Sequence, residues 1–269
     1  MKKVVLFTFV AVAIFTSCGE YSKVLKSQDA DIRYSYAKKY FNQKKYVKSA
    51  ALLEGLVYYF RGRSEAEESL YLLAQSYYGQ KDYVTASEYF KSYSNSYPKG
   101  EFVELAKYYS AYGLYLDSPD PRLDQAQTYE SINLFLLYLE DYPQSERAKE
   151  SQAILFELQE KLAYKEFLAA RLYYNLGTYM GNNYGACIVT VDNALKSYPD
   201  TRYREEFVYL KICSKHELAL VSIDERLQGR YRDVVDEYYN YTNEYPEGKY
   251  AKQVKKLFDY ANERIARNF

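Results

Sequence analysis

The chain has 269 residues, 48% of them hydrophobic, so it can fill one extended array or two compact domains and is too apolar for wholesale disorder. Lys and Arg total 36, as do Asp and Glu, and this neutrality argues against nucleic-acid binding, which requires a net basic face. Tyrosine is unusually frequent, with 36 residues against no Trp. Because a tyrosine ring has a polar tip, it suits half-buried helix faces and binding grooves alike.

The first residues have the form of a bacterial lipoprotein signal peptide. Two lysines precede an apolar run at residues 4–15, which is too short to cross a bilayer core of roughly 30 Å. Residues 15–18 read Phe-Thr-Ser-Cys and resemble a lipobox, with Phe15 where Leu is usual. We predict a signal peptide over residues 1–17 and a diacylglycerol and an N-acyl chain on Cys18. The alternative is an ordinary signal peptide with an incidental cysteine.

The anchor predicts a location. Gly19 and Glu20 follow Cys18, and no run of acidic residues precedes the fold. Some Gram-negative groups mark surface-displayed lipoproteins with such a run. Its absence favours a lipid-anchored protein on the periplasmic face of the outer membrane, with a polar lipidated tether over residues 18–30.

Residues 31–269 predict an all-α fold. Almost no segment alternates with period two, so we expect no sheet. The amphipathic segments predict helices at residues 31–42, 46–60, 64–79, 83–97, 101–116, 124–142, 145–180 (with a break near Leu162), 184–198, 201–228, 231–245 and 248–267.

A repeat organises these helices. The dipeptide Tyr-Pro recurs at residues 97–98, 142–143, 198–199 and 245–246, each time after an amphipathic stretch, and proline marks a helix end. In the second unit, small and large residues follow the tetratricopeptide spacing at Ala74, Tyr77, Tyr83, Ala86, Phe90 and Pro98. The sequence therefore predicts a tetratricopeptide-like α-solenoid of about five helix pairs, with an N-terminal half over about 31–143 and a C-terminal half over about 144–269.

Nothing in the sequence indicates catalysis, a bound cofactor or a metal. Cys187 and Cys213 could form a disulfide in the periplasm, but cysteines in helices are more often small buried residues. His216 is the single histidine and cannot build a His-based metal site. No Gly-rich phosphate loop or Gly-x-Ser-x-Gly elbow occurs. We expect a protein that is not an enzyme.

Three segments resemble the BamD family of outer-membrane lipoproteins. They are residues 18–27 (CGEYSKVLKS), residues 122–145, and residues 160–174 followed by Tyr198-Pro-Asp-Thr201. In the second segment, the residues that carry the likeness are Asp124, Gln125, Thr128, Phe135, Tyr142, Pro143 and Ser145. The similarity spans most of the chain after Cys18.

The resemblance implies a scaffold subunit of the machinery that assembles β-barrels into the outer membrane. Its C-terminal repeats would hold the periplasmic POTRA domains of the barrel-forming partner, and its N-terminal repeats would receive unfolded barrel substrates. Accessory lipoproteins are further candidate partners. One position departs from the family: Thr190 stands where an arginine often pairs with the partner, so that Lys196 or another basic residue would have to take over this contact.

The first helix of a tetratricopeptide unit lines the concave face. Carrying the register of Ala37, Ala74 and Ala111 forward predicts an aromatic groove for an extended peptide. The candidate residues are Tyr34, Lys38, Phe41, Tyr71, Gln75, Tyr78, Tyr108, Tyr112 and Tyr115. The alternative for each tyrosine is simple packing between helices.

Two other functions stay open on the sequence. One is a generic periplasmic tetratricopeptide adaptor lipoprotein of the cell envelope or of division. The other is a glycan-binding outer-membrane lipoprotein, against which the absence of Trp and the modest loops count.

Overall fold

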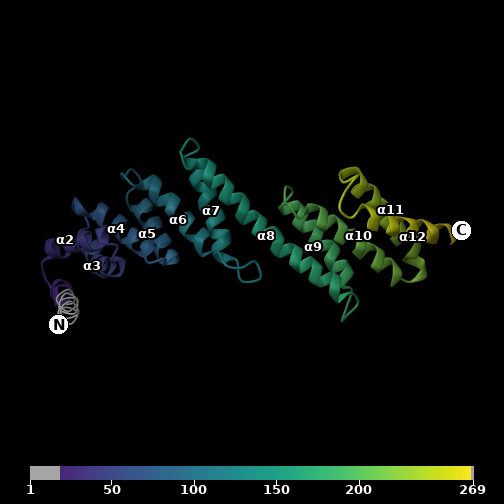
Figure 1. The fold of residues 1–269 in the computed structure, drawn as a ribbon, viewed down its shortest axis with the longest axis horizontal. Helices are drawn as coiled ribbons and strands as arrows, with labels where there is room; N and C mark the ends of the chain where they lie inside the picture. The colour runs from purple at the N-terminus through teal and green to yellow at the C-terminus, as the bar shows by residue number, and fades with distance from the viewer. Residues whose placement is uncertain (1–18, 268–269) are drawn as a thin grey trace, which may run out of the picture. The chain divides into compact units, whose positions relative to one another are not determined.

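A computed structural model describes residues 19–267, and these residues contain no β-strand. A short helix at residues 19–25 is followed by eleven longer ones (Figure 1). They are α2 (Ala30–Asn42), α3 (Tyr46–Tyr59), α4 (Glu65–Gly79), α5 (Tyr83–Ser96), α6 (Val103–Asp117), α7 (Ala126–Asp141), α8 (Ala148–Leu176), α9 (Asn183–Ser197), α10 (Arg204–Leu220), α11 (Asp224–Glu244) and α12 (Ala251–Arg267).

The described chain divides into two compact units. The first holds the residues up to Pro119 together with Gln125–Leu155, and the second holds Asp120–Asp124 together with the residues from Phe156 onward. Within each unit, helices that follow one another in the chain pack side by side, as in a solenoid of helix pairs. The predicted all-α, tetratricopeptide-like architecture is confirmed.

Small residues set the spacing of the helices in the first unit. Ala37, Ala74 and Ala111 recur at intervals of 37 residues, one on the first helix of each pair, and none of the three has any exposed surface. A methyl group at the contact lets two helix backbones approach closely. The core fills in around them with larger side chains such as Leu53 and Phe90, which are fully buried.

Each Tyr-Pro turn in the first unit is held by a tyrosine–glutamate contact. In the first of these turns, the Tyr93 hydroxyl donates to Glu67 Oε1 at 2.5 Å and accepts from the Phe102 backbone N–H at 3.1 Å. Glu67 lies in the first turn of α4 and also accepts the Glu101 backbone N–H. The carboxylate therefore joins the start of α4 to the turn that ends the same helix pair.

The same contact recurs along the chain. Tyr138 donates to Glu104 at 3.2 Å in the first unit, and Tyr241 donates to Glu205 at 2.7 Å in the second. These tyrosines, like Tyr93, stand four residues before a Tyr-Pro tyrosine. At the remaining Tyr-Pro turn this position is Ala194, and the buried Glu160 carboxylate instead accepts the Arg202 backbone N–H directly at 3.2 Å.

Three sequence predictions of helix boundaries were wrong. α8 runs unbroken past Leu162, because Leu158, Leu162 and Ala163 are all buried on one continuous helix face. The predicted helix 201–228 ends at Leu220, and α11 begins at Asp224, so the chain breaks at Val221–Ile223 and not at Gly229. No proline or glycine marks that break; Ile223 adopts an extended backbone and the acidic first turn of α11 follows.

The residues before α2 also differ from the predicted polar tether. Residues 19–25 are helical, and Val24 is 94% buried in the core cluster of the first unit, with Tyr21 packed against that cluster. The cause is apolar periodicity: Tyr21 and Val24 are three residues apart and share one helix face. The start of the described chain is therefore part of the first unit.

Candidate functional site

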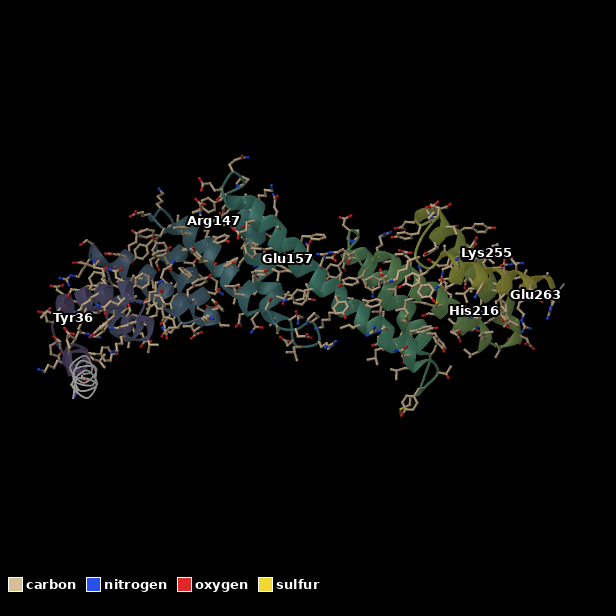
Figure 2. All side chains as sticks on the ribbon, in the orientation of Figure 1. Tyr36, Arg147, Glu157, His216, Lys255 and Glu263 are labelled. Atoms are coloured by element: carbon tan, nitrogen blue, oxygen red, sulfur yellow. The ribbon has the colours of Figure 1, made fainter. Side chains whose placement is uncertain are left out.

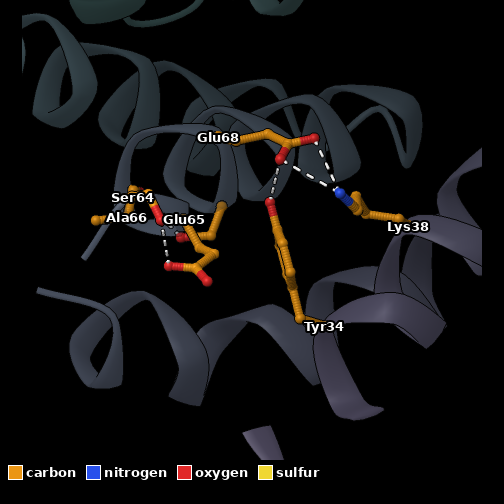
Figure 3. Close-up of polar contacts among 7 residues, drawn as sticks. Tyr34, Lys38, Ser64, Glu65, Ala66 and Glu68 are labelled. Atoms are coloured by element: carbon orange, nitrogen blue, oxygen red, sulfur yellow. Dashed lines mark hydrogen bonds and ion pairs between the residues drawn. The ribbon is translucent and has the colours of Figure 1, made fainter. Parts of the chain in front are cut away.

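The predicted groove residues on α2 are joined to α4 by a carboxylate. Figure 3 shows the Tyr34 hydroxyl and the Lys38 ammonium converging on Glu68, at 2.6 Å and 3.4 Å. Burial and the Glu68 carboxylate raise the pKa of Tyr34 well above its usual range, so the hydroxyl stays protonated and donates. Phe41, the third residue of this set, packs edge-on against Tyr46 at the start of α3. Tyr34 is buried, whereas Lys38 and Phe41 keep part of their surface.

The predicted groove residues on α4 pack partly against the fold and are partly exposed. Tyr71 stacks on Phe102 with ring centroids 4.4 Å apart, and its hydroxyl accepts from Gln75 Nε2 at 3.0 Å. Tyr78 meets Tyr109 of α6 edge-on at 5.2 Å. All three predicted residues of this helix are half-buried. Part of the Tyr71 and Tyr78 rings therefore packs against other side chains of the protein, and the rest stays exposed for contact with a ligand.

The set on α6 forms a run of tyrosines along one helix face. Tyr108 stacks on Tyr112 at 5.4 Å, and Tyr112 lies 5.7 Å from Tyr115. Tyr108 is buried and Arg147, labelled in Figure 2, lies over its ring at 5.6 Å. Tyr112 and Tyr115 are half-buried. Of the nine predicted residues, Tyr34 and Tyr108 serve mainly as packing, and the other seven keep exposed surface.

Sequence reasoning missed several residues in this region. Glu68, Phe102 and Tyr109 hold the predicted tyrosines in place, and they lie outside the helix register set by Ala37, Ala74 and Ala111.

The sequence also gave no prediction of a cavity of about 290 Å³ between α5, α6 and α7. Leu134, Leu137 and Tyr138 line it together with the Lys107–Asp141 ion pair, whose atoms are 2.6 Å apart. The sequence signal for this cavity is the spacing of Leu134, Leu137, Tyr138 and Asp141, which places these four side chains on one face of α7.

The second unit carries an exposed apolar surface around the α8–α9 turn. Met180 is 90% exposed, Tyr179 67% and Val189 60%, with Leu172 and Leu176 on the preceding helix also exposed. Met180 has a backbone φ of +56°, a conformation that non-glycine residues adopt at a cost. Several large exposed apolar side chains in one region are typical of a protein-binding site.

Thr190 forms no outward polar contact with which to replace the family's arginine. Its hydroxyl donates to the Ala186 carbonyl of its own helix at 2.9 Å. Lys196, six residues further along the same helix, is exposed. A basic docking residue on α9 would therefore have to be Lys196.

The cysteines and the histidine have structural surroundings. Cys187 and Cys213 are free thiols, and burial raises the pKa of Cys213 to about 11, which disfavours a reactive thiolate. His216, labelled in Figure 2, packs edge-on against Tyr260 at 5.2 Å. Within residues 19–267, no group of His, Cys, Asp and Glu side chains is arranged to hold a metal ion.

Cys18 lies outside the described residues, so the structure does not describe the proposed lipidation site. Among the described residues, no helix combines the length and the apolar character needed to cross a membrane.

Fold and surfaces define a class: a helical-repeat protein whose half-buried aromatic rows and exposed apolar turns suit binding to other proteins. A model of the YfiO family, described as outer membrane lipoprotein, matches residues 26–182 and 177–268. The chain belongs to this family of outer membrane lipoproteins.

A curated relative in Aquifex aeolicus (strain VF5), named as an outer membrane protein assembly factor, BamD, is 30% identical over 107 residues. The aligned region covers 40% of this chain and 35% of that relative, so the chain spans about a third of the length of the relative it matches.

Proposed function

We propose that this outer membrane lipoprotein is a non-catalytic scaffold of the β-barrel assembly machinery. It would be anchored on the periplasmic face through acyl chains on Cys18 and would need no cofactor beyond that covalent lipid. The relative that is named as an outer membrane protein assembly factor supports a role in outer-membrane protein assembly. The observation that carries the binding role is the row of half-buried aromatic side chains on α4 and α6.

The first unit is proposed to receive unfolded barrel proteins. An extended chain segment with aromatic side chains gains contact area against rigid tyrosine rings at little entropic cost. Tyr71, Tyr78 and Tyr112 keep exposed surface while their rings pack against Phe102, Tyr109 and Tyr108. The rings are therefore held in place before a ligand arrives, which reduces the cost of binding.

Replacing Tyr71, Tyr78 and Tyr112 together with Ala tests this groove. Capture of a peptide from the C-terminus of a barrel protein should fall by about tenfold or more, since several buried ring contacts are lost. The matched control replaces three exposed tyrosines, Tyr58, Tyr59 and Tyr129, with Ala. Circular dichroism should remain helical in both variants. Peptide binding that is unchanged in the groove variant would contradict the assignment.

The second unit is proposed to hold the POTRA domains of the barrel-forming protein, and accessory lipoproteins are candidates for further contacts. The exposed Met180 and Val189 supply an apolar contact surface, and Lys196 supplies a basic group for an acidic partner residue. Interfaces gain most of their affinity from such apolar centres with a few charged contacts at the rim.

Affinity purification from solubilised outer membranes tests the function as a whole. Recovery of a barrel protein with POTRA domains is expected, and this recovery should be lost in a Met180→Asp, Val189→Asp variant but kept in a Leu136→Asp control on α7. Recovery of division proteins or of glycan-transport components in its place would favour one of the two other functions that the sequence left open.

A further inference from the structure

The turns between the paired helices of the first two repeats carry short sequences that are identical at four of five positions. Residues 43–47 read Gln-Lys-Lys-Tyr-Val and residues 80–84 read Gln-Lys-Asp-Tyr-Val. The two turns are neighbours: residues 44–48 line one shallow hollow together with Gly79 and Gln80. A Cβ at Gly79 would lie 2.6 Å from the Tyr46 ring, so glycine is needed for this approach. We call Lys44, Lys45, Lys48 and Lys81 the lysine edge.

The lysine edge places four positive charges in two neighbouring turns. Among the described residues, none of its four lysines forms an ion pair with an acidic side chain. Two carboxylates close to the edge in the fold or sequence have other partners. Glu20 pairs with Lys39 at 3.2 Å and is attracted to Lys45 without an ion pair, and Asp82 caps α5 by accepting the Thr85 backbone N–H. The ammonium groups of Lys44, Lys45 and Lys81 belong to exposed residues.

Local helix chemistry opposes this concentration of lysine. The N-terminus of a helix favours negative charge, yet α3 begins after Lys45, has Lys48 in its first turn and has no acidic residue there. Lys44 and Lys81 have φ values of +57° and +64°, where glycine or asparagine would be less strained. Residues that break local rules without a gain in packing point to a function.

Apolar side chains stand beside these lysines. Val47 is 68% exposed and Val84, at the equivalent position of the next repeat, is 42% exposed. Exposed apolar side chains flanked by lysines are typical of surfaces that lie in the headgroup region of a bilayer, where the aliphatic stems reach the acyl boundary and the ammonium groups meet phosphate.

The start of the described chain lies against the same edge. Tyr21 is 5.0 Å from the Lys48 ammonium group and packs edge-on against Tyr40 at 5.7 Å, while Glu20 contacts Lys39. Residue 19 directly follows Cys18. A lipid on Cys18 would therefore enter the membrane next to the lysine edge and hold it at a high local concentration near the headgroups.

We propose that the lysine edge binds the anionic surface of the membrane leaflet in which the lipid on Cys18 is inserted. This proposal rests on the proposed anchor. The short helix at residues 19–25 and the two turns then form a second contact beside the acyl chains, and the contact limits how the first unit can tilt on the membrane. Phosphate-bearing lipids supply the complementary charge, and attraction to them falls off within the range set by salt screening.

Lysine footprinting on the full-length, lipidated protein tests the contact. The protein is reconstituted into vesicles of phosphatidylethanolamine with phosphatidylglycerol, or of phosphatidylcholine alone, and treated with an amine-acetylating reagent. Mass spectrometry then reports acetylation at each lysine. In the anionic vesicles, acetylation of Lys44, Lys45 and Lys81 should fall by roughly threefold or more and recover at high salt. Lys99 and Lys149, exposed elsewhere in the first unit, should be acetylated equally in both.

Equal acetylation of the lysine edge in the two compositions, whether high or low, would overturn the proposal. Failure of the anchor would look different, because the protein would then not stay with either kind of vesicle. A Lys44→Glu, Lys45→Glu, Lys81→Glu variant provides a second measurement: crosslinks from a photoactivatable phosphatidylglycerol to residues 43–48 should be lost. A Lys99→Glu, Lys149→Glu, Lys252→Glu control changes the charge equally at three other exposed lysines and should keep them. Crosslinks at the original level in the first variant would contradict the contact.

Discussion

The buried tyrosines of this protein act as hydrogen-bond donors to carboxylates. Tyr34, Tyr93 and Tyr241 each donate to a glutamate on another helix. Burial raises the pKa of all three hydroxyls, so each keeps its proton. The composition predicted half-buried tyrosines, but the glutamate partners lie 34, 26 and 36 residues away in the sequence and could not be assigned from it.

Replacing Tyr93 with Phe tests this role at one residue. The ring stays in the core, but the Glu67 carboxylate loses a donor and the Phe102 backbone N–H loses its acceptor. We expect the free energy of unfolding to fall by about 1–3 kcal/mol, as measured by denaturant titration. Tyr58→Phe is the control, since Tyr58 is 66% exposed, and it should be neutral. Equal stability of both variants would show that the hydroxyl contact contributes little.

The helices themselves were largely predictable, because amphipathic periodicity and the Tyr-Pro stops are local signals. The ends of α10 and α11 were not, since no proline or glycine marks residues 221–223 and the break depends on how the two helices pack on each other. The prediction of a break in α8 was wrong because tertiary packing, and not a local signal, determines whether this helix continues. Burial of Leu158, Leu162 and Ala163 favours one continuous helix over any local preference.

Ala74→Leu tests the close approach of neighbouring helices. Ala74 has no exposed surface and lies in a core cluster with Ala86 and Phe90, so a larger side chain must displace one of these neighbours. We expect a loss of about 1–3 kcal/mol in the free energy of unfolding. Ala266→Leu, at an exposed position on α12, should change stability little. Thermal or denaturant unfolding followed by circular dichroism compares the two, and an equal effect would refute the packing argument.

For the protein as a whole, the many buried tyrosines determine how stability responds to alkaline pH. Burial raises the pKa of Tyr174 and Tyr245 to about 12, and it also raises the pKa of Tyr78, Tyr108 and Tyr209. In the unfolded chain, tyrosines titrate near about pH 10. Between these values the unfolded chain releases protons that the folded protein retains, so rising pH favours unfolding.

We therefore expect stability to be maintained below about pH 10 and to fall steeply above it, by up to about 1.4 kcal/mol per pH unit for each tyrosine that titrates only on unfolding. Denaturant midpoints measured from neutral to alkaline pH would show the fall. Tyrosinate absorbance should rise together with the loss of helical circular dichroism. Titration of most tyrosines near about pH 10 with helicity intact would contradict the burial assigned here.

The sequence by itself determined the helical-repeat architecture, the lipobox prediction and the family resemblance, because all three depend on local patterns: periodicity, Tyr-Pro stops and short motifs. Only the tertiary structure decided which tyrosines are packed and which stay exposed. It also showed that residues 19–25 dock on the first unit and that two lysine-bearing turns meet at one edge. Those features arise from contacts between residues far apart in the chain, which periodicity does not encode.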